Sequence, residues 1–278
     1  MNYFTETTHE IKGYSIYSRL YSVDDAKANI LFLHGYCEHS GMYIQIAKYF
    51  TSNNFNFYMI DLPGHGRSSG KRGIISDFNE YVDITFEYIK LIKKSDIFCC
   101  EQLPLYCFGF SLGGLIISKL SSSKDSSQFI DGVVCINPTF QINSFWVYFF
   151  YYIIIIFISI FPIFPFSLID ENIFNDKHQA KIYFDDTYRV KEIDIYTTMK
   201  IIQEGKKEIS FREYSPMLLI QSEKDKLIHP KGSIKKSKHF RLPQSKFHLI
   251  KNQNHMLLHE DQEYLLTVIN EWIMTFID

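Results

Sequence analysis

The sequence predicts an α/β fold with a mostly parallel central sheet, because short apolar runs alternate with amphipathic stretches of helical length. The apolar runs are rich in β-branched and aromatic residues and are bounded by Gly, Pro or Asp, as buried strands of parallel sheets are. Six strands are expected, at residues 29–33, 57–60, 105–108, 132–136, 217–221 and 246–250.

Four helices are expected between and after these strands, at residues 43–50, 78–92, 112–120 and 262–276. In the second, Phe78, Tyr81 and Val82 begin an apolar set whose members lie mostly three and four residues apart. This is the spacing of one helix face. Because strands and helices alternate, we expect helices to cover both faces of the sheet.

The alternation breaks once, between Pro138 and about Ser210. About seventy residues intervene before the strand pattern resumes at Met217. An ordinary connection in a compact domain is much shorter, so this segment is expected to be an inserted element with a structure of its own.

Size, charge and cysteine content exclude several classes of protein. A chain of 278 residues with 46% hydrophobic content is long enough to bury one large core. Its formal charge of −2 gives no basic excess, so we expect no nucleic-acid partner. The five cysteines are odd in number, which favours a reducing compartment, and the first residues lack a signal-peptide pattern. A cytoplasmic protein is expected.

No metal and no organic cofactor are expected, because the sequence has neither an HExxH nor a CxxC motif. The adjacent Cys99 and Cys100 lack ligand spacing. Gly64 and Gly66 indicate a turn, since no third glycine opens a helix after them as a dinucleotide-binding loop requires.

The segment Gly109-Phe110-Ser111-Leu112-Gly113 stands directly after one expected strand and directly before an expected helix. This is the context of a nucleophile elbow, a strained strand-to-helix turn that presents a serine. Side chains at the two glycine positions would collide with the neighbouring strand and helix. The alternative is a turn whose serine only caps the helix. The placement favours Ser111 as a nucleophile.

A serine hydroxyl needs a base to take its proton and an acid to orient that base, and folds with such an elbow supply them in the order serine, acid, histidine. Asp225 and His255 follow the last two strands in that order. Glu223 is the weaker alternative for the acid. Among other histidines, His248 lies within a strand and is expected to be packed, and His259 is expected to be solvated or to cap the final helix.

Two backbone N–H groups are expected to stabilise the oxyanion of the reaction. One follows the nucleophile, at Leu112, and the other comes from the loop after an early strand, at Tyr36. Tyr36 follows His34 and Gly35, where the glycine lets the chain pass close to the site. His34 is expected to tie loops together as a structural residue.

These residues resemble the monoacylglycerol lipase and lysophospholipase branch of the α/β-hydrolases, which is also described as serine aminopeptidase S33-like. Residues 34–40 (HGYCEHS) are similar to the HGxGEHS loop of that family, and residues 61–68 (DLPGHGRS) to its D-x-x-GHG-x-S loop. Residues 70–78 (GKRGIISDF) are similar to its G-x-R-G…DF segment. With the elbow, four motifs occur in order.

The resemblance implies an α/β-hydrolase fold with Ser111 as nucleophile, Asp225 as acid and His255 as base. It also implies Tyr36 and Leu112 as oxyanion donors. The chain departs from the family pattern by carrying Cys37 for glycine, Met42 for Arg, Phe110 for His and Ser222 for glycine. None of these departures removes a catalytic atom.

The resemblance further implies a helical cap inserted after the sixth strand, which matches the break after Pro138. We therefore expect a catalytic core of residues 1–138 and 211–278 and a cap of residues 139–210. The cap contains a stretch that begins at Phe145 and ends at Ile169 without one charged residue.

The uncharged stretch 145–169 is long enough for a transmembrane helix. A single crossing there would separate Ser111 from Asp225 and His255, so spanning and catalysis exclude each other. We favour peripheral membrane contact, through an interfacial helix or the wall of a lipid tunnel, over simple burial.

The leading hypothesis is an enzyme that hydrolyses the carboxylic ester of a single-chain lipid, monoacylglycerol or lysophospholipid, through an acyl-enzyme on Ser111. Two alternatives are a general carboxylesterase or thioesterase for small soluble esters, and a ligand-binding protein of the same fold without catalysis. The expected partner is the lipid or small ester itself. The sequence gives no oligomeric state.

Overall fold

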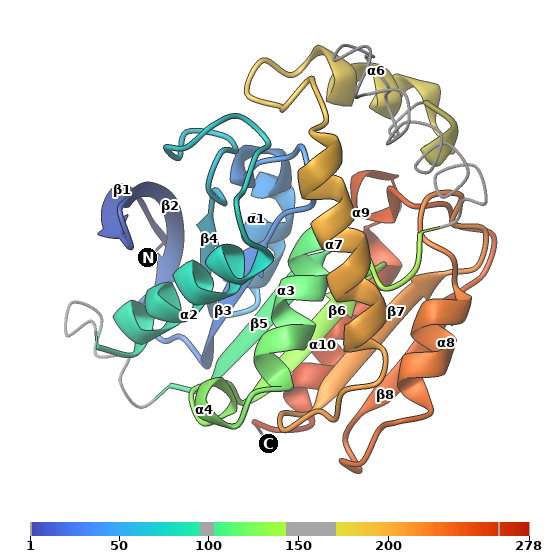
Figure 1. The fold of residues 1–278 in the computed structure, drawn as a ribbon. Coiled ribbons are helices and arrows are strands. Elements are labelled where there is room, and N and C mark those ends of the chain that lie inside the picture. The colour runs from blue at the N-terminus through green and yellow to red at the C-terminus, as the bar shows by residue number, and fades with distance from the viewer. Residues whose placement is uncertain (1, 95–102, 143–170, 261, 278) are drawn as a thin grey trace, which may run out of the picture.

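The computed structural model describes residues 2–94, 103–142, 171–260 and 262–277. Figure 1 shows a twisted sheet with helices on both faces. The sheet has eight strands in the order β1-β2-β4-β3-β5-β6-β7-β8. They are β1 (Asn2–Ile11), β2 (Tyr14–Val23), β3 (Ala28–Leu33), β4 (Phe55–Ile60), β5 (Leu105–Phe110), β6 (Gly132–Ile136), β7 (Met217–Ser222) and β8 (Lys246–Ile250). Strands β3 to β8 pair in parallel, which confirms the predicted sheet.

The hairpin of β1 and β2 was not predicted. β1 pairs antiparallel with β2, and β2 pairs antiparallel with β4, so this hairpin forms one edge of the sheet. The two strands are joined through Lys12 and Gly13, which adopt positive φ of 49° and 82°. Such a two-residue turn matches the right-handed twist of the strands that it joins.

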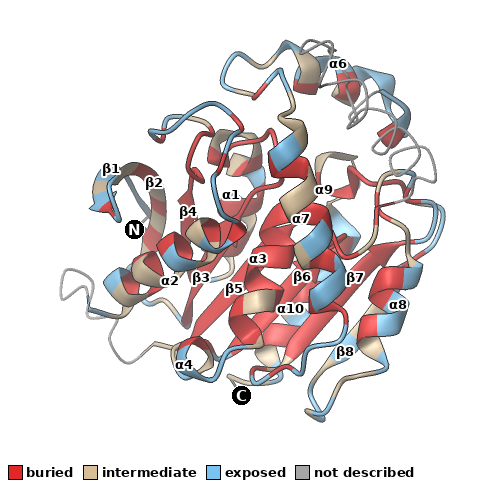
Figure 2. Cartoon of the chain, viewed as in Figure 1, coloured by how far each residue is buried: buried red, intermediate tan, exposed pale blue. Residues whose placement is uncertain are grey.

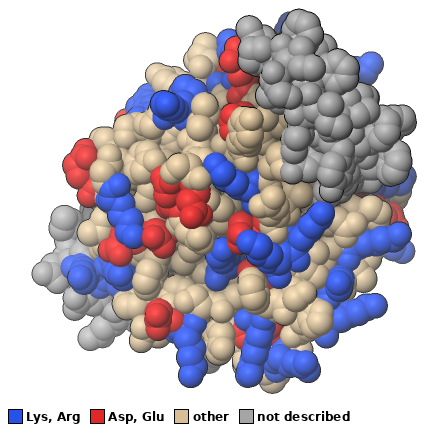
Figure 3. Space-filling view, in the orientation of Figure 1, with Lys and Arg blue, Asp and Glu red and all other residues tan. Residues whose placement is uncertain are grey.

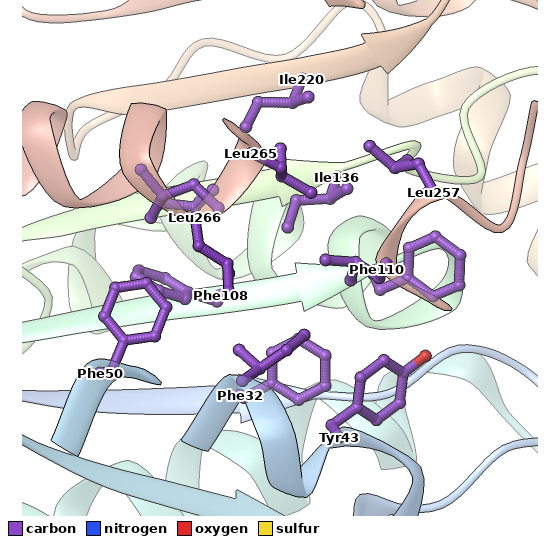
Figure 4. Packing of buried hydrophobic residues seen from close by; sticks show 14 of the residues in the cluster. Phe32, Tyr43, Phe50, Phe108, Phe110, Ile136, Ile220, Leu257, Leu265 and Leu266 are labelled. Atoms are coloured by element: carbon purple, nitrogen blue, oxygen red, sulfur yellow. The ribbon is translucent and has the colours of Figure 1, made fainter. Parts of the chain in front are cut away.

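The two large clusters of the core lie one on each face of the sheet, because successive strand residues point to opposite faces. Ile30 and Phe32 of β3 face one cluster, and Leu31 and Leu33 face the other. The first cluster includes residues of α1 (Ile44–Ser52) and α10 (Glu263–Met274). Figure 4 shows some of its side chains from β3, β5, β6 and β7 and from the helices that cover them. Figure 2 shows the buried sheet between exposed helix faces.

The second cluster packs against α2 (Phe78–Lys94), α3 (Leu112–Ser121) and α7 (Ile195–Glu208). The shorter helices are η1 (Ser40–Tyr43), α4 (Lys124–Ser127), η4 (Glu171–Ile173), α6 (Lys177–Asp185), α8 (Lys231–Ser237) and α9 (Leu257–Glu260). The predicted cap therefore contains η4, α6 and α7 among its described residues, and α7 also covers the sheet beside α3. The division into core and cap stays a prediction.

The end of α7 is fastened by a buried ion pair. Lys236 of α8 is fully buried, and its Nζ lies 3.0 Å from Glu208 Oε1. The same ammonium donates to the backbone oxygens of Glu208 and Phe211. Glu208 Oε1 also accepts from the hydroxyls of Ser118 and Ser122 in and after α3. One carboxylate thus joins α3, α7 and α8.

We expect Lys236→Ala to lower the free energy of unfolding by about 3–5 kcal/mol, because it leaves the Glu208 carboxylate buried without its counter-charge. Urea unfolding of both proteins measures the loss. The matched control is Lys235→Ala, which alters the exposed neighbour and should change stability by less than about 0.5 kcal/mol. Equal stabilities of the two variants would contradict the assignment.

Candidate active site

The loops that follow β3 to β8 meet at the carboxyl edge of the sheet, where ligands bind in open α/β folds. Ser111 lies there, between β5 and α3, and is 8% exposed. Its backbone adopts φ 52° and ψ −110°, a conformation that residues other than glycine rarely adopt. The backbone N–H of Ser111 donates to Ile136 O at 2.9 Å, which fixes the turn against β6.

The two glycines of the elbow are required by close backbone contacts. A Cβ at Gly109 would lie 2.2 Å from Gly113 O. A Cβ at Gly113 would lie 2.3 Å from Leu33 O in β3. Both distances are far inside van der Waals contact, so the predicted collisions are confirmed and the turn admits no side chain at either position.

His255 and Asp225 come to Ser111 from the loops after β8 and β7. His255 Nε2 lies 3.2 Å from Ser111 Oγ, and His255 Nδ1 lies 2.8 Å from Asp225 Oδ2. All three residues are at least nine-tenths buried. The structure thus brings together the three side chains that the sequence singled out, in one chain of hydrogen-bonded atoms.

The carboxylate of Asp225 is held by more than the histidine. Its Oδ1 accepts from the backbone N–H groups of Leu227 and Ile228, at 2.9 and 2.7 Å. Its Oδ2 also accepts from Gln221 Nε2 at 3.2 Å. These donors, together with His255, hold the carboxylate of Asp225 in one orientation. Glu223, the alternative acid, is exposed and instead accepts from the backbone N–H of Asn252.

Two asparagines that the sequence analysis missed fix the loop of the histidine. Asn137, after β6, donates to His255 O at 2.8 Å and accepts from the N–H of Ser222. Asn254 accepts from the N–H groups of Lys226 and His255. The loops after β6, β7 and β8 are therefore joined around His255, and its ring position is set by backbone anchors.

Tyr36 and Leu112, the predicted oxyanion donors, lie in the loop after β3 and at the start of α3. Tyr36 lines the same cavity as Ser111, and Leu112 directly follows Ser111 as the first residue of α3. In the described part of the chain, neither N–H donates a hydrogen bond to the protein. Their predicted role as oxyanion donors stays a prediction. His34 Nδ1 donates to Gly35 O, and His34 Nε2 accepts from the N–H of Leu62. These contacts join two loops, which agrees with the predicted structural role of His34.

Glu38 is a buried carboxylate in this cavity that the sequence analysis did not single out. Its Oε2 accepts from the N–H of Gly35 at 2.7 Å and from the hydroxyl of Tyr43 at 2.5 Å. Its Oε1 lies 3.3 Å from His259 Nε2. Burial acts to raise the pKa of Glu38, but its interactions with His259 and Tyr43 outweigh burial and lower the pKa below its usual value.

The environment of His259 differs from the expected one. The residue lies in α9, its side chain is 12% exposed, and its ring packs near Tyr43, Phe110 and Tyr183. The expectation of a solvated or capping histidine was wrong, because Glu38 offers a buried acceptor that local sequence does not reveal. His248 is partly buried in β8 and contacts the hydroxyl of Tyr264.

The cavity beside Ser111 is mainly apolar. Its apolar lining includes Ile142, Ile173, Ile193, Ile201, Leu227 and Met256. Phe110, which stands where the family pattern has His, packs against His255 with ring centroids 5.1 Å apart. Thr139, which the sequence analysis also missed, places its Oγ1 3.3 Å from Ser111 Oγ. The site therefore joins a polar end, where the hydroxyl lies, to an apolar wall.

Within the described ranges, no group of three or more His, Cys, Asp and Glu side chains could hold a metal ion. Cys37 lies beside Tyr36 in a left-handed conformation with φ 72°, and burial raises the pKa of its thiol to about 12. A thiol with that pKa is protonated at neutral pH and is a poor nucleophile.

A search for membrane-spanning helices among the described residues finds no helix that is long and apolar enough to cross a bilayer. The uncharged stretch 145–169 lies outside the described residues.

Comparison with known families places most of the chain in one of them. A model of the Hydrolase_4 family, described as serine aminopeptidase S33, matches residues 24–262. This match confirms the resemblance seen in the four motifs.

Individual relatives match shorter stretches. Human monoglyceride lipase is 32% identical over 117 residues, which are 42% of this chain and 37% of that protein. The phospholipase YtpA of Bacillus subtilis is 29% identical over 118 residues, which are 42% of this chain and 43% of that protein. The aligned stretches thus span less than half the length of these relatives.

Among solved structures, the monoacylglycerol lipase of Paleococcus ferrophilus superposes with a TM-score of 0.79 and 22% identity. The superposition covers 94% of this chain and 98% of that one. This likeness establishes an α/β-hydrolase fold.

The lowered pKa of Glu38 predicts a pH-dependent stability difference. Ionised Glu38 stabilises the folded state above its unfolded pKa, and that contribution is lost as the pH falls through the folded pKa. Glu38→Gln should therefore be less stable than the wild type at neutral pH, and the gap should shrink below about pH 4.5. Denaturant unfolding at several pH values measures the gap. Glu10→Gln, at an exposed position, is the control, and a pH-independent gap for Glu38→Gln would refute the prediction.

Proposed function

The chain belongs to the Hydrolase_4 family, the serine aminopeptidase S33 group, and from this membership we propose that it is a serine hydrolase that cleaves the carboxylic ester of a single-chain lipid. The observation that carries the proposal is the chain of contacts from Ser111 Oγ through His255 to Asp225, at 3.2 and 2.8 Å, inside a mainly apolar cavity. Monoacylglycerol and lysophospholipid are the proposed substrates.

In the proposed reaction, His255 Nε2 takes the proton of Ser111 as its Oγ attacks the acyl carbonyl carbon. Asp225 accepts from Nδ1–H, which holds the ring in the tautomer with a free Nε2 and stabilises the imidazolium. The tetrahedral oxyanion accepts from the N–H groups of Tyr36 and Leu112, which are worth several kcal/mol when aimed at it in advance. Its collapse expels the alcohol, which takes the proton back from His255.

The acyl-enzyme is then hydrolysed by the same groups. His255 takes a proton from water, the hydroxide attacks the ester carbon on Ser111, and the fatty acid leaves as the serine oxygen is reprotonated. Thr139 Oγ1 lies near Ser111 Oγ and offers the resting hydroxyl a second partner. We propose that this contact orients the hydroxyl between turnovers.

Two observations support an ester of a lipid over a peptide. The wall of the cavity is apolar and suits an alkyl chain, since each buried methylene contributes about 0.8 kcal/mol. The relatives named above are a monoglyceride lipase and a phospholipase, both enzymes of lipid esters. We also propose that residues 139–210 are a cap, because Ile173 and Tyr183 from that segment line the cavity with Ser111.

Two measurements test this function. A fluorophosphonate probe should label the purified protein, and absence of labelling would overturn the proposal that it is a serine hydrolase. Release of fatty acid from monoacylglycerols, lysophospholipids and short p-nitrophenyl esters should be fastest with the long-chain lipids. A preference for short soluble esters would assign the protein as a general carboxylesterase.

Replacement of the three central residues should abolish turnover with the fold intact. We expect Ser111→Ala and His255→Ala each to lower kcat by roughly 10³-fold or more, with non-additive losses in combination, because the residues act as a unit. Asp225→Asn should also be crippling, whereas Glu223→Gln, two residues away and exposed, should be nearly silent. Labelling of the folded Ser111→Ala variant by fluorophosphonate would refute the assignment of Ser111 as the nucleophile.

We further propose that the protein contacts membranes peripherally through residues 145–169, which contain no charged residue. Direct entry from the bilayer spares a long acyl chain the cost of crossing water.

Replacing Phe149 and Phe157 by Asp should therefore weaken binding to liposomes and slow turnover of bilayer-held lipid. Cleavage of short soluble esters should be unchanged, because Ser111, Asp225 and His255 are untouched. Unaltered liposome binding by the double variant would refute the contact. A variant that unfolds would show that the two rings belong to the core.

A further inference from the structure

The charges of this chain are separated along the sequence. Residues 223–251 hold nine Lys and Arg and two acidic residues, whereas the remaining residues hold twenty Lys and Arg and twenty-nine acidic residues. Of the nine cations, Lys236 is buried against Glu208. The other eight are exposed: Lys224, Lys226, Lys231, Lys235, Lys238, Arg241, Lys246 and Lys251. We call these eight side chains the basic face.

The basic face occupies one end of the sheet. It lies on α8, on the edge strand β8 and on the loops that flank them. Figure 3 shows Lys and Arg gathered over this part of the molecule, around α8 and below it. Three segments that the fold brings together thus form one cationic surface.

The side chains of the basic face form no ion pair within the described part of the protein. In the described part of the chain, the ion pairs include none of the eight, and Glu223 is the one exposed acid of the segment. Charged edge strands also prevent aggregation, and this role accounts for Lys246. It does not account for the cations on α8 and in the loop before it.

Apolar side chains are exposed among the cations. Ile234 of α8 and Leu249 of β8 are each 37% exposed. A hollow between them is lined also by Lys224, Lys226 and Lys231. Cations mixed with exposed apolar residues are the composition of surfaces that bind anionic lipid headgroups and insert shallowly among them.

The same face adjoins the site. Lys224 and Lys226 flank Asp225 in the loop after β7, and the next residues of that loop, Leu227 and Ile228, line the cavity with Ser111. An anionic surface against the basic face would therefore lie next to a wall of the cavity.

We propose that the basic face docks the protein on anionic lipid bilayers. The proposal rests on the lipid-ester function proposed above, since a bilayer is where such substrates reside. The interaction is electrostatic, and it should weaken with added salt as the Debye length shortens. Nucleic acid is less suited, because the chain as a whole carries a net charge of −2.

The test measures co-sedimentation of the full chain with vesicles of phosphatidylcholine alone or mixed with phosphatidylserine. The wild type should bind the mixed vesicles more tightly and lose this preference at high salt. The variant Lys231→Gln, Lys235→Gln and Lys238→Gln should bind mixed vesicles at least about tenfold more weakly. The control, Lys27→Gln, Lys48→Gln and Lys124→Gln, removes the same charge from exposed sites elsewhere and should bind like the wild type.

A second triple variant on the same face, Arg241→Gln, Lys246→Gln and Lys251→Gln, tests the proposal independently if the first variant misfolds. Equal binding of both vesicle types by the wild type, or full binding by both face variants, overturns the proposal. A shift of duplex DNA or RNA without binding to mixed vesicles assigns the face to nucleic acid and also overturns it. Hydrolysis of short soluble esters by every variant, measured in parallel, separates failure of docking from failure of the enzymatic function.

Discussion

The conformation of Ser111 is the constraint on which the rest of the site depends. A non-glycine residue with φ 52° and ψ −110° is strained by roughly 1–3 kcal/mol and persists only when its neighbours over-determine it. Here β5, β6 and α3 do so, through the tight contacts of Gly109 and Gly113 and through bonds to the backbone of Ser111 from Leu115 and Thr139. The packing of the sheet therefore holds the Ser111 hydroxyl at the carboxyl edge of the sheet.

A parallel sheet gives this strained turn its partners. The loops after β3, β7 and β8 leave the same edge as the loop after β5, so residues distant in sequence converge without long connections. Hydrogen bonds then refine the arrangement, with Asn137 holding the backbone of His255 and Glu38 holding the N–H of Gly35. The apolar core brings the loops together, and these buried hydrogen bonds hold their backbones in place.

Local patterns predicted the parts of the fold that depend on continuous apolar runs. β3 to β7 are buried along their whole length, so their sequences are mostly apolar and the strands could be predicted from sequence. The β1–β2 hairpin was missed because β1 is exposed along almost its whole length and so contains no buried apolar run, and because the turn at Lys12 and Gly13 gives a weak signal. α8 was missed because only seven residues form it, and most of them are polar.

At the candidate site, the grouping of Ser111, Asp225 and His255 could be predicted because motif and chain order restrict the choice of residues. Glu38, Thr139 and the buried setting of His259 were missed, since their roles depend on contacts between distant segments. Glu38 and His259, for example, are 221 residues apart in the chain. No local pattern records such a pairing.

The separation of Ser111 from His255 by 144 residues bears on how the protein matures. Synthesis proceeds from the N-terminus, so the elbow between β5 and α3 leaves the ribosome well before the loop after β8, which carries His255. Contacts so distant in sequence carry a large loop-closure cost and form slowly. A partly made chain therefore presents Ser111 without His255 beside it. Their contact forms only after β7, β8 and the loop that follows β8 have joined the sheet, so the formation of this contact marks a late step of folding.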